Sequence, residues 1–172
     1  MSTATDVANP LVAIIAATER DVTADVSKAA AVFRVAGEAT GRVSSTIRIG
    51  KFTIDADEPP ALGEGAAPNP VEYALAGLLS CQVATYRVWA VNLGIALDSV
   101  NISIDGDLDF RGFFGFDDSV RPGFSAVRLN VRLSGPDTAE RYSELQKVVN
   151  AHCPVLDLFR NPTPVESTLT VA

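Results

Sequence analysis

The stretch "NPVEYALAGLLSCQVATYRVWAVNLG", residues 69–94, decides the fold because it is the longest helix candidate in the chain. Asn69 is a good N-cap, Pro70 suits the first helical position, and Glu72 stands three residues after the cap. Gly94 is typical of the residue that follows a helix. Apolar side chains occupy nearly the whole circumference, as in a helix buried in a core or a membrane. Its charged and amide side chains argue against a membrane span, so we expect a long helix buried in a protein core.

Short segments rich in β-branched residues lie on both sides of this helix. They predict strands at residues 31–37, 42–49, 51–57, 99–110, 125–135 and 165–171. A second helix is predicted at 136–153, and residues 111–124 form an aromatic loop. We expect residues 1–30 to be a helical or partly ordered arm and residues 31–172 to be one domain. Because the strands cluster, the sequence predicts an α+β fold with antiparallel sheets wrapped around the long helix.

Composition and charge exclude several classes of protein. The 172 residues carry 14 Lys+Arg against 21 Asp+Glu, a net charge of −7, which argues against a nucleic-acid-binding surface. Two cysteines and one histidine are too few for a metal cage, so we expect no metal. The start of the chain lacks the pattern of a secretion signal, which predicts a cytoplasmic protein without a structural disulfide.

Two thiols, Cys81 and Cys153, are the chemically distinctive side chains. Small residues share the helical face of Cys81 and permit either close packing or a pocket above the sulfur. A buried free cysteine often serves as a small hydrophobe, so spacing alone leaves open whether the two thiols meet. A third interpretation is a Cys/His hydrolase, in which His152 would have to reach Cys81.

The segments "NPVEYALAGLLSC" and "HCPVLDLF" together carry a resemblance to the OsmC/Ohr family of osmotically inducible and organic hydroperoxide resistance proteins. The resemblance covers residues 31–172 and is carried by the Asn-Pro start of the helix, the small residues before Cys81, and the late Cys153. It implies an intertwined homodimer of α+β subunits in which the two cysteines approach each other beside the dimer interface. It also implies reduction of organic hydroperoxides without a metal or flavin cofactor.

The resemblance implies a role for each thiol. Cys81 would be the peroxidatic thiol and would become a sulfenic acid, and Cys153 would resolve it as an intramolecular disulfide. An external dithiol, in the family often a lipoyl protein, would restore both thiols. The family supplies an arginine from an early strand region to lower the pKa of the peroxidatic thiol; "EATGRVSS" makes Arg42 the candidate, with Arg48 as the alternative.

One departure from the family pattern concerns activity. Val71 occupies the place of the glutamate that orients the arginine in the organic-peroxide branch, and the acid here is Glu72. Glu72 is either an active-site partner or a capping residue. The departure resembles a less characterised OsmC-like branch, so the alternative function is a non-catalytic homodimer that binds a small apolar molecule in the same pocket. Another open choice concerns three phenylalanines, which form either packing contacts or an apolar wall for the substrate: Phe113, Phe114 and Phe116.

Overall fold

The computed structural model describes residues 9–171, and the chain divides after Ala76 into two compact units. The first unit holds α1 (Pro10–Ala24), the 3-10 helix η1 (Val26–Ala29), β1 (Val35–Ala39), β2 (Ser45–Ile49), β3 (Phe52–Ala56) and the first turns of α2 (Pro70–Asn92). The second unit holds the rest of α2, β4 (Ser99–Asp107), α3 (Phe110–Phe114), β5 (Ala126–Ser134), α4 (Ala139–His152) and α5 (Pro154–Arg160). The fold is therefore α+β with antiparallel sheets, as the sequence predicts.

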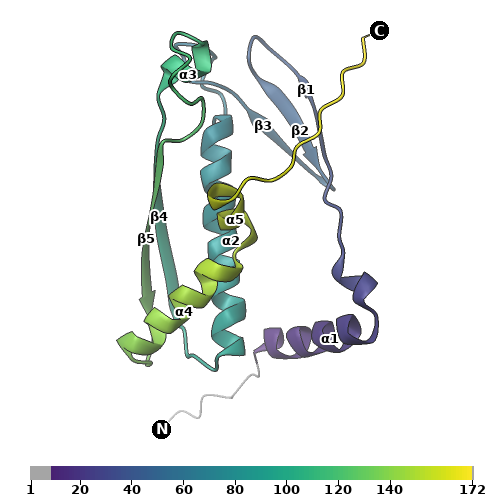
Figure 1. Cartoon of the computed structure of the whole chain (residues 1–172), viewed down its shortest axis with the longest axis vertical. Coiled ribbons are helices and arrows are strands. Elements are labelled where there is room, and N and C mark those ends of the chain that lie inside the picture. The colour runs from purple at the N-terminus through teal and green to yellow at the C-terminus, as the bar shows by residue number, and fades with distance from the viewer. Residues whose placement is uncertain (1–8, 172) are drawn as a thin grey trace. The chain divides into compact units, whose positions relative to one another are not determined.

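In the first unit, β1, β2 and β3 form an antiparallel sheet in chain order (Figure 1). Val35 pairs with Ile49 and Ala39 with Ser45, so β1 begins four residues later than predicted, after residues 31–34. The predicted arm is helical where the structure describes it, in α1 and η1, whereas residues 1–8 lie outside the described part of the chain.

The loop from β3 to α2 is organised by one carboxylate. Asp57 is only 3% exposed and accepts hydrogen bonds from the backbone N–H groups of Glu58, Glu64 and Ala66 at 2.9–3.1 Å. A Cβ at Gly63 would collide with Oδ1 of Asp57, so a larger residue there would displace the carboxylate. The carboxylate thus stabilises the loop that connects β3 to α2.

Replacing Asp57 with asparagine is expected to destabilise the chain in a pH-dependent way. The backbone N–H of Ala66 is the largest cause that lowers the pKa of Asp57 below its usual 3.8, and burial opposes it. A lowered folded-state pKa adds stability above the unfolded-state pKa and loses it as the pH falls through the folded-state pKa. In urea unfolding, D57N should have a lower midpoint at pH 7, and its difference from the native chain should shrink below about pH 4. The control D118N should have the urea midpoint of the native chain both at pH 7 and at the lower pH. A difference between D57N and the native chain that does not depend on pH would contradict this account.

In the second unit, β4 and β5 form a two-stranded antiparallel sheet beside α2, α4 and α5 (Figure 1). Ile102 pairs with Val131, and Ile104 with Leu129, and all four are partly buried against core residues of the helices. The alternate positions are exposed, which confirms the alternation predicted for residues 125–135. The larger core joins α2 to α4 through five buried residues: Tyr86, Ala90, Ile95, Leu145 and Val149.

The long helix begins at Pro70 as predicted, ends at Asn92, and is followed by Gly94 with a φ of +60°. Two guanidinium groups bind backbone carbonyls beyond its end: Arg87 donates to Leu97 O at 2.7 Å, and Arg141 to Leu93 O at 2.8 Å. These cations complement the negative end of the helix dipole. By length and composition α2 could cross a membrane, but it is packed against α4 along a face that carries buried polar side chains. In this single chain only that face is fully buried, and the other faces are half-buried or exposed.

Three segments differ from prediction. The predicted closing strand at 165–171 is wrong: these residues are extended without ladder pairing, and Val165, Leu169 and Val171 are more than 80% exposed. An alternating pattern shows that a segment suits a strand, whereas a strand also needs a neighbouring edge to pair with. The strand predicted at 99–110 ends at Asp107, and the short helix α3, capped by the Asp109 side chain, occupies the start of the predicted loop at 111–124. Helix α5 was not predicted, although Pro154 stands at its first position.

Candidate functional site

The two thiols meet in the second unit. Cys81 lies on α2, and Cys153 lies where α4 ends and α5 begins. Their Sγ atoms are 3.4 Å apart, with Cys153 as donor, and both cysteines are free. A disulfide joins sulfurs about 2.05 Å apart, so a short movement of either side chain would close the bond.

Backbone hydrogen bonds of two helices fix the position of Cys153. Its N–H donates to Val149 O at 3.0 Å, as the C-cap of α4, and its carbonyl accepts from Asp157 N at 3.0 Å, within α5. The Cys153 side chain is 2% exposed and packs in a cluster with the buried residues Leu78 and Leu156. Helix packing, and not a loop, therefore presents this sulfur to Cys81.

Burial governs the acidity of Cys81 within this unit. Cys81 is half-buried, and loss of solvation is the largest effect on its pKa, which it raises above the usual 9.0. The backbone N–H of Val155 opposes this rise, while the neighbouring Cys153 thiol adds to it. The second unit by itself therefore favours the neutral thiol, and a nearby cation would favour the thiolate.

The predicted partners Arg42 and Glu72 lie in the first unit. Arg42 is exposed in the turn between β1 and β2. Within residues 9–171, no carboxylate lies within 4.0 Å of its guanidinium, whereas Arg48 pairs with Glu38 at 3.3 Å. Glu72 accepts from Asn69 N at 2.9 Å, while Asn69 Oδ1 accepts from Glu72 N at 2.8 Å. This reciprocal capping box gives Glu72 a structural task at the start of α2.

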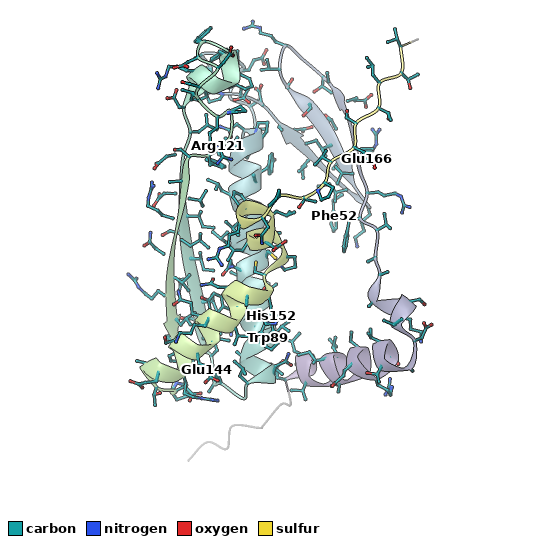
Figure 2. All side chains as sticks on the ribbon, viewed as in Figure 1. Phe52, Trp89, Arg121, Glu144, His152 and Glu166 are labelled. Carbon is teal, nitrogen blue, oxygen red and sulfur yellow. The ribbon has the colours of Figure 1, made fainter. Side chains whose placement is uncertain are left out.

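His152 is engaged away from Cys81. Its ring lies against Trp89, with ring centroids 4.4 Å apart (Figure 2), and its Nδ1 is 2.8 Å from Val148 O. Trp89 stands eight residues beyond Cys81, about 12 Å along the helix axis. The geometry therefore does not supply the base that a Cys/His hydrolase would need at Cys81.

The predicted aromatic wall forms a cluster of its own. Phe114 lies 5.0 Å from Phe113 and 5.2 Å from Phe116 between ring centroids, and all three are 47–76% exposed. Sequence reasoning instead overlooked Phe159, which packs on the cluster around Cys153 and stacks with Phe124. The spacing of Leu156 and Phe159 after Pro154, typical of a helix, was the signal for this contribution.

Sequence reasoning also missed a buried amide beside the thiols. Gln82 follows Cys81 on α2, is fully buried, and neither its Nε2 nor its Oε1 has a hydrogen-bond partner among the described residues. The Tyr86 hydroxyl, one turn further, is likewise buried, and its burial raises its pKa to about 12 against a weaker opposing effect of Gln146. Buried polar atoms without partners are rare and costly.

Replacing Gln82 with methionine is therefore expected to stabilise the protein. Removing both unpartnered polar atoms while keeping a similar volume should raise the free energy of unfolding by about 1–3 kcal/mol. Urea unfolding measures the change, with the exposed S80A variant of the same helix as a control that should stay within about 0.5 kcal/mol. A destabilised Q82M protein would mean that the amide has a partner in the assembled molecule.

The chain is thus an α+β protein with two free thiols in contact, one on a long helix and the other at the junction of two helices. The family model of OsmC-like proteins matches residues 63–168, and the chain belongs to this family. An OsmC-like protein from Mycoplasma pneumoniae has the same fold, with a TM-score of 0.66 and 18% identity over 76% of this chain and 88% of that one. None of the curated proteins matches this chain.

Two solved structures of organic hydroperoxide resistance proteins share the fold. The organic hydroperoxide resistance protein OsmC from Legionella pneumophila has a TM-score of 0.59 and 23% identity over 76% of this chain and 90% of that chain. The organic hydroperoxide resistance protein OhrB of Bacillus subtilis has a TM-score of 0.56 and 24% identity over 76% and 91% of the two chains. At these identities the likeness concerns the fold.

Proposed function

We propose that the protein is a thiol-dependent peroxidase that reduces organic hydroperoxides to alcohols. The Cys81 thiolate attacks the distal peroxide oxygen, the O–O bond breaks, and the alcohol leaves with a proton while Cys81 becomes a sulfenic acid. The Cys153 thiol then attacks the sulfenic sulfur, and water leaves as the Cys81–Cys153 disulfide forms. An external dithiol, such as a dihydrolipoyl group, returns both cysteines to thiols and completes the electron balance.

The 3.4 Å separation between the two Sγ atoms is the observation that carries this proposal. Cysteines that serve only as core filler need not lie in contact, whereas resolution of a sulfenic acid requires it. The family membership and the hydroperoxide resistance proteins of the same fold support the same chemistry.

The proposed source of positive charge is Arg42. Its guanidinium has no carboxylate partner within the described part of the chain, while the alternative Arg48 is already paired with Glu38. A guanidinium near Cys81 would offset the effect of burial on the thiol pKa. We assign no role in the chemistry to Glu72, because its hydrogen bonds with Asn69 at the start of α2 already explain a glutamate at this position.

Titration of free thiols tests the proposal directly. One equivalent of cumene hydroperoxide per chain is expected to consume both thiols and to produce cumyl alcohol, and peptide mapping should recover Cys81 linked to Cys153. Hydrogen peroxide at the same dose should react more slowly. If both thiols remain free after the organic peroxide is added, the peroxidase assignment fails.

We further propose a cytoplasmic homodimer as the working form. Several large apolar side chains are more than 60% exposed on the single chain, which a partner subunit would cover: Phe33, Val35, Phe52, Val165 and Leu169. Light scattering of the purified protein measures the mass, and the 18.1 kDa of a single chain would contradict the dimer.

A non-catalytic homodimer that binds a small apolar molecule is the second candidate. The observation in its favour is the raised pKa of Cys81, which lowers its reactivity at neutral pH. This candidate predicts thiol alkylation with an unshifted or raised pKa in the purified dimer, together with no consumption of cumene hydroperoxide.

A further inference from the structure

A hollow lies between α5 and the start of β5, and two of the residues that line it also pack around the thiols. Its volume is about 450 Å³, within the range of small-molecule sites. Leu78 and Leu156 line it and also belong to the buried cluster of Cys153. The other apolar side chains that line it come from six residues: Phe124, Ala126, Val127, Leu129, Leu158 and Phe159.

The aromatic wall of the hollow is held in place by the adjoining strand. Phe124 stacks on Phe159, with ring centroids 6.3 Å apart and 28° between their planes. On the β4 side, the Phe124 ring lies over Gly106, where an added Cβ would come within 2.6 Å of it. The absence of a side chain at position 106 thus lets the ring lie against the sheet, and the wall is formed before any ligand arrives.

Two arginines line the same hollow. Arg160 uses one N–H of its guanidinium for Asn150 O at 3.3 Å, and Arg121 (labelled in Figure 2) lies along Gly123, with Nη2 3.4 Å from a Cβ built there. Neither guanidinium has a carboxylate within 4.0 Å in residues 9–171. Both arginines also line a second hollow near Pro162 and Val165.

Two guanidinium groups without a carboxylate partner among the described residues thus line an apolar hollow. A guanidinium has five N–H donors and binds carboxylates through paired hydrogen bonds, while the apolar walls suit a hydrocarbon tail. We propose that this hollow binds an amphipathic monocarboxylate, with its carboxylate on Arg121 and Arg160 and its tail against Leu129, Leu156 and Phe124. The site needs no thiol chemistry, so it stands apart from the proposed peroxidase function.

Isothermal titration calorimetry with three probes tests the site on the full chain. Octanoate supplies head and tail, 1-octanol the tail alone, and acetate the head alone. Octanoate is expected to bind about tenfold or more tightly than octanol, because hydrogen bonds to charged groups add to affinity. Acetate is expected to give no measurable binding. Equal affinities for octanoate and octanol would overturn the proposal.

The variant R121Q/R160Q is expected to weaken octanoate binding about tenfold and to leave octanol binding unchanged. Arg132 lies on the opposite, exposed face of β5, so R132Q removes a charge from the same strand without touching the hollow and should leave octanoate binding intact. Undiminished octanoate binding by R121Q/R160Q, or an equal loss in R132Q, would overturn the proposal. Circular dichroism confirms that each variant is folded.

Methyl chemical shifts of Leu129 and Leu156 supply a measurement that needs no variant. Octanoate should shift both, and acetate neither. A full chain that shows neither heat nor methyl shifts with millimolar octanoate overturns the proposal, and the hollow is then filled by the C-terminal segment or a second copy. The C81S protein should bind octanoate like the native chain, which separates failure of this site from failure of the peroxidase.

Discussion

Replacing Cys81 with serine should reduce the consumption of cumene hydroperoxide to the rate seen without protein. The thiolate is the nucleophile in this chemistry, and a serine hydroxyl at the same position is neither ionised nor able to accept the peroxide oxygen. Xylenol orange detection of remaining peroxide measures the rate, with dihydrolipoamide as the electron donor. Circular dichroism should show an unaltered fold, because serine is nearly the same size as cysteine.

The matched variant C153S separates the two sulfurs by role. It should still react once with peroxide, but its Cys81 sulfenic acid should persist and be trapped by dimedone, since no thiol lies 3.4 Å away to resolve it. Excess peroxide should then carry Cys81 to the sulfinic acid. Equal peroxide consumption by C81S and the native protein would remove any catalytic role for Cys81.

Replacing Arg42 with glutamine should raise the pKa of the Cys81 thiol. Burial alone raises this pKa above 9.0 within the second unit, and the proposed guanidinium acts in the opposite direction. A nearby opposite charge shifts a pKa by about 1–3 units, so R42Q should have about ten- to a thousandfold less thiolate at pH 7. The rate of iodoacetamide alkylation against pH, measured in the C153S background, reports a single thiol.

Two further variants make the Arg42 experiment specific. R34Q removes an exposed charge from the same unit and should leave the pH profile unchanged. R48Q releases Glu38 and should also leave it unchanged if Arg42 is the partner. A shift in R48Q without one in R42Q would assign the charge to Arg48, and no shift in either variant would contradict a role for both arginines.

Local signals in the sequence were enough to place the long helix and the paired strands. Asn69, Pro70 and Gly94 mark the ends of α2 through side-chain capping, a preset φ and a positive φ, which depend on neighbouring residues alone. The alternation over β5 reports burial of one face of a sheet, which also repeats locally. The predicted strand at 165–171 failed because pairing depends on a distant edge.

The contact between the thiols was not available from local patterns. Cys81 and Cys153 lie 72 positions apart in the chain, and the sequence alone left open whether they are core filler or a reactive pair. Family resemblance predicted their approach, and the packing of α5 on α2 accomplishes it through Leu156 and Leu78. The buried Gln82 was missed for a related reason: an amide on a helix gives no sign of which neighbours will surround it.

Because Cys153 completes the last turn of one helix and starts the next, its sulfur is only as well placed as those two turns are stable. Fraying of either turn would move the Cys153 sulfur away from Cys81, and a Cys81 sulfenic acid would then not be resolved to the disulfide. The proposed catalytic cycle would then depend on backbone hydrogen bonds remote from the peroxide, and slow amide exchange at Cys153 and Asp157 would be the evidence that they are stable.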